Sequence, residues 1–322
     1  CIKAGLVTGE VMVTDSTHIK AYASSERTEV VSVIKTPSEY IQSLHEEAKK
    51  IEKELQEKRR GKTKSGRKKS EDMPEREVKR SLTDPDSGLL GRPNKPKGFH
   101  YLAHTTVDTA YGIITDIHVT QGNINDHEPY VERLAVQKEK FGLHIQQVGA
   151  DRGYDVSHVH KKLEELGITG YISAKKQERK SDAFVYQAET DTFLCPFQKT
   201  LQFTHLNWKK EYQKYMKVYA TKTKDCRECP FRTDCLSKTA KHKQLSKPLF
   251  HEYGLSNQLR NQTEKYKKVR QLRNTWAEGT FGTLKQCHTL TKTYFRGISK
   301  NQVRCLFSAL ALNLKRMVNA LS

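Results

Sequence analysis

Apolar and polar residues follow two patterns along the chain, and each pattern predicts one type of secondary structure. Short apolar runs bounded by turn residues predict strands at residues 11–14, 99–107, 113–120, 145–150 and 168–174. Apolar residues that recur every three or four positions predict helices at residues 38–58, 126–141, 156–166, 263–286 and 301–317. Strands alternate with helices in the second half of the series, which predicts a mixed sheet covered by helices.

Two polar segments interrupt this series, so we expect an α/β core with two insertions. The expected core comprises residues 1–24, 98–177 and 263–322, the last part being C-terminal helices. A helical and basic insertion is expected at residues 25–97, after the first strand, and a cysteine-bearing insertion at residues 178–262. The last helix is amphipathic, with six apolar residues on one face: Val303, Leu306, Phe307, Leu310, Leu314 and Met317.

Composition adds a strong positive charge to this picture. The chain has 57 Lys and Arg residues against 37 Asp and Glu residues, which is a formal net charge of +20. Because a polyanion relieves such an excess, we expect nucleic acid as the partner, ahead of an anionic membrane surface. No apolar run approaches the roughly 20 residues of a membrane span, and there is no signal peptide, so a membrane partner is not expected.

The basic excess is densest at residues 59–69, RRGKTKSGRKK. This segment is interpreted either as a plain solvated linker or as a clamp on the DNA backbone. The candidate DNA contacts in it are Arg59, Arg60, Lys62 and Lys64. The chain begins at Cys1 without a methionine, so we expect a fragment of a longer protein. The cysteine usage predicts a reducing, cytoplasmic compartment.

Three carboxylates lie at informative places in the predicted elements. Asp15 follows the first strand, Asp151 follows the strand at 145–150, and Glu278 lies inside the helix at 263–286. Groups at the carboxyl ends of neighbouring strands converge on one edge of a sheet. Three converging carboxylates would repel one another, and two Mg²⁺ or Mn²⁺ ions would relieve that repulsion.

Each carboxylate also has a structural explanation. Asp15 could cap the following turn, Asp151 could cap the following helix, and Glu278 could be a surface charge of its helix. Two polar residues of the loop NIND, Asn125 and Asp126, could support the site, although Asp126 is the expected N-cap of the helix at 126–141.

The cysteines of the second insertion have spacing that suits a metal. Cys226 and Cys229 form a Cys-x-x-Cys pair, and Cys195 and Cys235 could complete a tetrahedral zinc site. His205 and His242 are alternative ligands, and buried or redox-active thiols are the structural alternative. Such a structural zinc ion would fold a polar insertion that has little core of its own.

Aromatic residues lie among lysines in the same insertion. They could stack on unpaired bases or form the core of a small sheet, which is the interpretation we favour for most of them: Trp208, Tyr212, Tyr215 and Tyr219.

Several segments, taken in order, resemble the bacterial insertion-sequence transposases of the DDE class. VTDSTHIKAYAS is similar to the first-aspartate segment of that family, VGADRGYD to the second, and WAEGTFGTLKQ to the glutamate segment. FRGISKNQVRCLFSALALNLKRM resembles the closing helix, and some members carry a four-cysteine insertion before the glutamate helix. The resemblance implies an RNase H-like mixed sheet flanked by helices, with Asp15, Asp151 and Glu278 as catalytic metal ligands.

The resemblance also implies a function. A DNA transposase with endonuclease activity would cut the ends of its element and join them to target DNA by a two-metal mechanism, as a homodimer at synapsis, in the bacterial cytoplasm with the nucleoid. Two other interpretations remain: a catalytically silent DNA-binding protein derived from a transposase, and a zinc-organised interaction module. They predict, respectively, DNA binding without cleavage and zinc without Mg²⁺-dependent chemistry.

One departure from the family motif bears on activity. Many relatives have Tyr-x-x-Arg-x-x-x-Glu, then six residues and a lysine. Lys285 is present here, but Gln271 and Asn274 occupy the tyrosine and arginine positions. Arg270 and Arg273 lie next to these positions and are candidates to replace the motif arginine as DNA-phosphate contacts.

Overall fold

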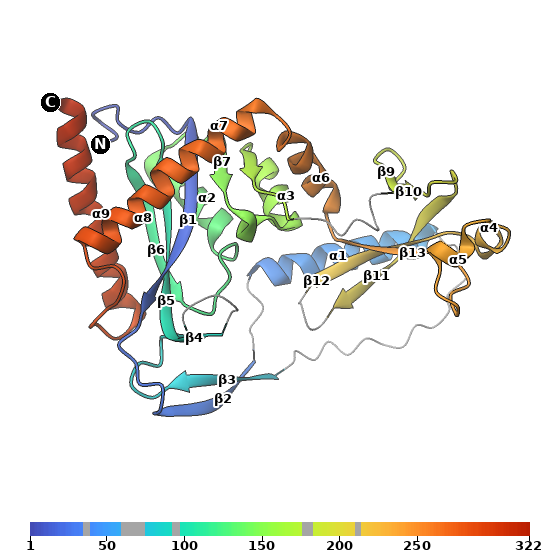
Figure 1. The fold of residues 1–322 in the computed structure, drawn as a ribbon, viewed down its shortest axis with the longest axis horizontal. Coiled ribbons are helices and arrows are strands. Elements are labelled where there is room, and N and C mark those ends of the chain that lie inside the picture. Colours follow the sequence, from blue (N-terminus) through green and yellow to red (C-terminus); the bar gives the residue numbers. More distant parts are fainter. Residues whose placement is uncertain (35–38, 59–74, 92–96, 176–182, 210–213) are drawn as a thin grey trace. The chain divides into compact units, whose positions relative to one another are not determined.

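The predicted alternation of strands and helices is present in the computed structural model (Figure 1), which describes residues 1–34, 39–58, 75–91, 97–175, 183–209 and 214–322. The chain divides into two units. The first unit comprises residues 1–32, 77–175 and 253–322, and the second comprises residues 33–76 and 176–252. No helix in the described ranges is both long and apolar enough to cross a membrane.

A mixed sheet forms the centre of the first unit. Among the described residues it has six strands, and these are β1 (Val11–Lys20), β4 (Gly88–Leu90), β5 (Gly98–Asp108), β6 (Ile114–Gln121), β7 (Gln147–Ala150) and β8 (Thr169–Ile172). The order is β4–β5–β1–β7–β8, with β6 also paired to β5. β5 is antiparallel to both β1 and β6, whereas β1, β7 and β8 are parallel. β1 therefore joins the antiparallel and parallel halves of the sheet.

Helices cover both faces of this sheet, because alternate residues of each strand point to opposite faces. Val13 and Ile19 of β1 lie in one apolar cluster with α8 (Gly279–Cys287) and α9 (Ile298–Leu321). Met12 lies in the other cluster, with α2 (Tyr130–Phe141) and α3 (Ser157–Glu165). Two further helices, α6 (His251–Arg260) and α7 (Glu264–Arg273), precede α8.

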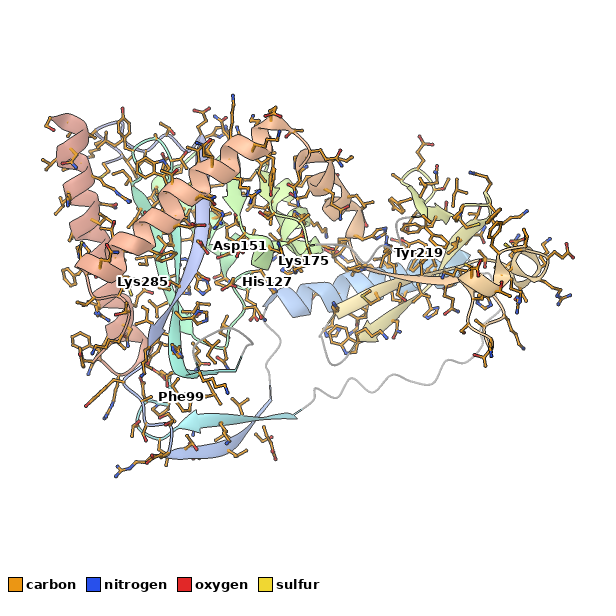
Figure 2. The ribbon with its side chains drawn as sticks, in the orientation of Figure 1. Phe99, His127, Asp151, Lys175, Tyr219 and Lys285 are labelled. Carbon is orange, nitrogen blue, oxygen red and sulfur yellow. The ribbon has the colours of Figure 1, made fainter. Side chains whose placement is uncertain are left out.

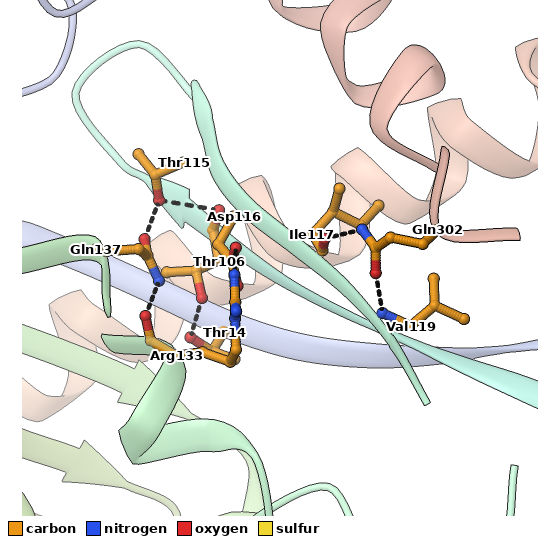
Figure 3. A network of polar contacts seen from close by, with 9 residues as sticks. All are labelled: Thr14, Thr106, Thr115, Asp116, Ile117, Val119, Arg133, Gln137 and Gln302. Carbon is orange, nitrogen blue, oxygen red and sulfur yellow. Dashed lines mark hydrogen bonds and ion pairs between the residues drawn. The ribbon is translucent and has the colours of Figure 1, made fainter. Parts of the chain in front are cut away.

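Polar contacts hold α2 against the β5–β6 hairpin (Figure 3). Arg133 of α2 donates to both carboxylate oxygens of Asp116, at 2.9 and 2.5 Å. Gln137 of α2 accepts a 2.7 Å hydrogen bond from the Thr115 hydroxyl. Because Gln137 is buried, this hydrogen bond keeps its amide from being an uncompensated polar group in the interior.

Helix α9 binds the edge of the sheet through two side-chain amides. Gln302 accepts from Val119 N and donates to Ile117 O, at 2.8 and 2.7 Å (Figure 3). Asn313 makes the same pair of bonds with N and O of Ile114, at 2.8 and 2.8 Å. These amides satisfy backbone groups of β6 that an edge strand would otherwise leave exposed to other chains.

This docking decides which face of α9 is buried. Small or polar residues such as Cys305 and Ala309 face the sheet, together with Leu312. The apolar face predicted from the sequence is largely exposed, with Phe307 at 67% and Leu310 at 52%. The periodicity identified two faces correctly, but the more apolar of them lies in solvent because the amide-bearing side pairs with β6.

The second unit has its own antiparallel sheet, in the order β13–β12–β11–β10–β9. Its elements are α1 (Glu39–Lys58), β9 (Val185–Gln187), β10 (Thr192–Leu194), β11 (Thr200–Lys209), β12 (Lys214–Ala220), α4 (Thr223–Arg227), α5 (Arg232–Cys235) and β13 (Gln244–Pro248). A separate two-stranded sheet pairs β2 (Thr28–Ile34) with β3 (Glu75–Ser81).

The aromatic residues of the second unit form its core. Tyr219, in β12, is labelled in Figure 2. It is fully buried against Phe193, and its hydroxyl donates a 2.6 Å hydrogen bond to Asp191. Trp208 packs on Tyr215, with ring centres 4.7 Å apart. The favoured interpretation, a small sheet core, holds for Tyr219, whereas Trp208 and Tyr215 are half-buried and Tyr212 lies outside the described residues.

Candidate active site

Two of the predicted carboxylates lie on adjacent parallel strands. In the β1–β7 pairing, Val13 is opposite Gly149. Continued by two residues, this register places Asp15 beside Asp151. Asp151 directly follows the last residue of β7 (Figure 2). The sequence predicted that Asp15 ends its strand, and this is wrong, because β1 continues to Lys20. Asp15 thus lies inside β1, where its backbone is paired with Thr105 of β5.

Asp15 is a largely buried carboxylate, with 19% of its side chain exposed. Burial raises its pKa from 3.8 to about 6. The hydrogen bond from Ser16 N and the charge of Arg273 lower the pKa, whereas Asp151 and Asp126 raise it further. The site therefore carries more negative charge than its arginine balances, which is the condition that favours binding of a cation.

Asp151 caps the short turn that follows its strand. Its Oδ1 accepts a 2.7 Å hydrogen bond from Gly153 N, at the start of a 3-10 turn over Arg152–Tyr154. The structural role proposed from the sequence is thus present, although the capped element is this turn and not the following helix. The cap uses one carboxylate oxygen of Asp151, so it does not exclude a second role for this side chain.

Asp126 is a fourth acid at the same place. The sequence predicted that it caps the helix at 126–141, and this is wrong, because α2 begins at Tyr130 after Pro129. Asp126 instead accepts a 2.6 Å hydrogen bond from the Ser16 hydroxyl. A methyl group placed on Gly153 would lie 2.9 Å from Asp151 Oδ1 and 3.1 Å from Asp126 Oδ2, so the two carboxylates flank this glycine.

The predicted glutamate helix is interrupted by a π-helical turn. α7 ends at Arg273, residues Asn274–Glu278 form the π turn, and α8 begins at Gly279. Residues four apart share a face of an α-helix, but a π turn contains one extra residue, so residues five apart come into line. Arg273, five residues before Glu278, therefore takes the place that the family motif gives to residue 274.

Arg273 connects two of the predicted carboxylates. Its Nη1 donates to Asp15 Oδ2 and its Nη2 to Glu278 Oε1, both at 2.9 Å. The side chain of Arg273 is only 15% exposed, whereas that of Glu278 is 56% exposed. The Arg273 guanidinium thus brings Glu278, from the C-terminal part of the chain, to the strand that carries Asp15.

Two glycines allow this helix to approach the sheet closely. Gly149 of β7 faces Val269 of α7, and a methyl group on it would lie 2.6 Å from the Val269 side chain. Gly112, in the β5–β6 turn with φ +72°, faces the ring of Trp276, which a methyl group would approach to 2.2 Å. A side chain at either position would displace Val269 or Trp276 and so disturb the packing of the helical segment that carries Arg273 and Glu278.

The remaining cations predicted to bind DNA are partly placed. Lys285 lies in the last turn of α8, seven residues after Glu278 and on the same helical face (Figure 2). Arg270 is exposed in the last turn of α7. The other four candidates lie outside the described residues: Arg59, Arg60, Lys62 and Lys64.

Among the described residues, no group of three or more His, Cys, Asp or Glu side chains is arranged to hold a metal ion. At the carboxylates, the guanidinium of Arg273 lies between Asp15 and Glu278. The chemistry of these donors nevertheless fits Mg²⁺, which prefers carboxylate oxygens. The pKa of Asp15 is raised mainly by burial and to a smaller extent by the neighbouring acids Asp151 and Asp126, whose charges a bound cation would offset.

The cysteines do not support the zinc prediction. Cys195, Cys226, Cys229 and Cys235 are free thiols. Cys195 Sγ accepts from Lys199 N at 3.3 Å, and Cys226 Sγ lies 3.0 Å from the Thr221 hydroxyl. Stacking of Phe197 on Phe231, with ring centres 4.6 Å apart, brings the two cysteine-bearing loops together. Their thiols still form no metal site within the described residues, so no step is derived through zinc.

Comparison with known families points to one class of protein. Residues 194–318 match the family model described as Transposase DDE domain. The matched segment contains Glu278, Arg273 and Lys285, but neither Asp15 nor Asp151. The match supports a DDE-type transposase, whose substrate is DNA. Searches of curated proteins and of solved structures return no match.

Proposed function

We propose that this protein is an insertion-sequence transposase that cuts the ends of its element and joins them to target DNA. The observation that carries the proposal is the pairing of Arg273 with both Asp15 and Glu278, on a strand whose register with β7 brings Asp151 next to Asp15. The transposase family match over residues 194–318 supports it independently. The formal charge of +20 suits a DNA substrate.

The sheet supports an RNase H-like catalytic core. The hairpin of β5 and β6 lies antiparallel beside β1, and β7 and β8 follow in parallel on its other side. In this proposal, residues 1–24, 98–177 and 263–322 form most of the core. The two insertions are residues 178–262 and residues 25–97, except that β4 of the latter pairs with β5 and belongs to the core sheet. Each catalytic acid then comes from a different part of the core.

In this proposal Asp15, Asp151 and Glu278 hold two Mg²⁺ or Mn²⁺ ions. Bound there, the ions would supply the activation of the attacking oxygen and the stabilisation of the leaving one in phosphoryl transfer. The role of the chain is to hold the carboxylates together against their repulsion. Arg273 does this in the metal-free protein, and its guanidinium is suited to a phosphate once the carboxylates take metal.

The DNA backbone would be bound by cations on the glutamate helix. Arg273, Arg270 and Lys285 come from one continuous helical segment, α7 to α8. Arginine can contact a phosphate with two parallel hydrogen bonds, while lysine acts as a point charge. Element ends come in pairs, so the proposal includes a homodimer at synapsis.

The alternative of a catalytically silent DNA-binding protein rested on Asn274 in the arginine position of the motif. The π turn supports the active enzyme instead, because Arg273 contacts Glu278 and can take the role of the missing motif arginine. We therefore favour the active enzyme.

The test is cleavage and strand joining on DNA that carries the ends of the element, in Mg²⁺ or Mn²⁺. We compare the wild type with Asp151→Asn and Glu278→Gln. Glu264→Gln is the matched control, because Glu264 is an exposed acid of α7 paired with Lys267. We expect the wild type and the control to cut and join, and both site variants to bind DNA without reacting.

Two results would count against the proposal. If the site variants cut as fast as the wild type, the three-carboxylate site is wrong. If all four proteins bind the DNA and none of them reacts, the silent DNA-binding alternative replaces the transposase.

A further inference from the structure

An exposed group of aromatic and basic residues lies at the far end of the strand that carries Asp15. It combines Tyr22, just after β1, with residues of the loop that joins α8 to α9. Tyr22, Tyr294 and Phe295 are 53%, 65% and 50% exposed. Rings of this size are usually buried, so three of them together in solvent need an explanation.

Cations accompany these rings. The Arg296 guanidinium lies 5.0 Å from the centre of the Tyr22 ring, and the Lys292 ammonium lies 5.1 Å from the centre of the Tyr294 ring. The two tyrosine rings are 6.2 Å apart. Sites for single-stranded nucleic acid combine the same two elements, because exposed rings stack on bases and nearby cations hold phosphates.

The backbone under this group is firmly held. Lys20 N donates to Thr291 O at 3.0 Å, and Thr293 N donates to Lys20 O at 2.9 Å, so the loop adds to the end of β1. Asn301, which is fully buried, donates to the carbonyl oxygens of Phe295 and Gly297, at 3.1 and 2.8 Å. The loop is anchored by its backbone, and the three rings are not needed for that anchoring.

The nearby acids are already engaged. Asp84 is buried and accepts from the Tyr101 hydroxyl and from Gly297 N, at 2.8 and 3.1 Å. Asp86 accepts from Ile298 N at 3.1 Å. The exposed side of the loop itself presents Lys292 and Arg296, whose charge complements a phosphate backbone.

The distance from the carboxylates suits one continuous DNA substrate. Lys20 lies five residues beyond Asp15 on β1, which is about 17 Å at the rise of a strand. That length corresponds to about five base-pair steps of DNA. DNA held at Asp15 can therefore reach the aromatic group within one helical turn.

We propose that Tyr22, Tyr294 and Phe295, with Lys292 and Arg296, form a platform that binds unpaired DNA bases close to the cleavage site. We call these five residues the aromatic platform. The inference rests on the proposed function for its position next to the cleavage site, while its binding chemistry stands on the exposed rings and their cations. The proposed ligand of the platform is a short unpaired stretch of the DNA, which the three carboxylates do not bind.

The test measures DNA binding alone, in EDTA, by fluorescence anisotropy. The probes are a fully paired duplex of the element end and the same duplex with a few unpaired bases next to the cleavage position. Tyr22→Ala, Tyr294→Ala and Phe295→Ala are each expected to weaken binding of the unpaired probe about tenfold and that of the paired probe far less. Phe295→Trp is expected to keep the affinity, because stacking needs only an aromatic face.

Phe141→Ala is the matched control. Phe141 is also an exposed aromatic residue, at 39%, with Lys140 over its ring at 5.4 Å, but it lies at the end of α2. It is expected to leave both affinities unchanged. Thermal unfolding of all variants is expected to match the wild type, since the substituted rings are exposed.

Equal losses on the two probes, or no loss on either, would overturn the proposal. Equal losses would make the surface a general duplex contact, and no loss would make it a surface for another protein. Because the test needs no metal and no cleavage, its result is separate from that of the transposase assay. The preference for unpaired bases can hold even if the carboxylates prove inactive.

Discussion

Replacing Asp15 by asparagine gives a direct test of the electrostatics of the site. The change keeps the shape of the side chain, and the amide oxygen can still accept the hydrogen bond from Ser16 N. It removes the negative charge that is buried beside Asp151 and Asp126. The expected result is a protein that is more stable than the wild type at neutral pH in the absence of metal.

The magnitude follows from the pKa of Asp15, which burial raises from 3.8 to about 6. The folded chain holds this proton more tightly than the unfolded chain does. The stabilisation is therefore complete below about pH 4 and is lost as the pH rises through about 6. At about 1.4 kcal/mol for each pKa unit, the loss is about 3 kcal/mol.

The assay is thermal unfolding by circular dichroism in EDTA, at pH 4 and at pH 8. At pH 8 we expect Asp15→Asn to raise the melting temperature by about 6 °C, at about 2 °C for each kcal/mol in a chain of this size. At pH 4 the two proteins are expected to melt together, because Asp15 is then protonated. Asp234→Asn, which removes an exposed acid, is the control. Its melting temperature relative to the wild type is expected to be the same at both pH values.

The reasoning is refuted if Asp15→Asn lowers stability at pH 8. It is also refuted if the difference from the wild type is the same at both pH values, because the effect would then not depend on ionisation. Adding Mg²⁺ at pH 8 is expected to stabilise the wild type more than the variant, since the variant lacks the charge that binds the ion.

Two further predictions concern the helix that carries Glu278. Arg273→Gln is expected to cost about 2 kcal/mol in EDTA at pH 8, because it leaves the buried Asp15 charge unpaired. In an Asp15→Asn background it is expected to cost much less, and an undiminished loss in the double variant would contradict the pairing. Gly112→Ala is expected to cost about 2 kcal/mol or more and to change the fluorescence of Trp276, because the added methyl group meets its ring at a positive φ. Gly254→Ala, in α6 with open space around it, is the control and is expected to stabilise the protein slightly. Equal effects of the two substitutions would contradict the steric argument.

The sequence was sufficient to predict most of the strands around the site. Apolar residues bounded by turn signals identified β5, β6, β7 and β8 within a few residues, because strands that are buried on at least one face keep apolar residues there. The order of strands and helices left open whether β1 and β7 are neighbours. The structure pairs them, and this pairing brings Asp15 beside Asp151.

The sequence was not sufficient for the parts that depend on tertiary packing. Asp126 has the local context of a helix cap, and only the hydrogen bond from Ser16 shows that it belongs to the site. The sequence named both Arg270 and Arg273 as replacements for the motif arginine. A π turn leaves the apolar spacing of a helix almost unchanged, so motif spacing alone did not decide between them. The arginine five residues before the glutamate, with asparagine four before it, is the signal that could have indicated the extra residue.

The orientation of α9 has a similar cause. Helical periodicity separates an apolar face from a less apolar one, but it does not say which face meets the protein. Gln302 and Asn313 decide this by binding the backbone of β6. Such a pairing between side-chain amides and an edge strand has no sequence pattern that spacing could reveal.

The acids of the site and their arginine lie far apart along the chain, and this separation matters while the protein is being synthesised. Synthesis from the N-terminus produces Asp15, Asp126 and Asp151 well before Arg273. Until α7 has left the ribosome, a nascent sheet that pairs β1 with β7 gathers acids without their arginine, and cations from the surrounding solution have to screen them. The same late segment supplies α9, which covers the open edge of β6. The growing chain thus depends on its last helices both to neutralise the site and to protect the sheet from pairing with other nascent chains.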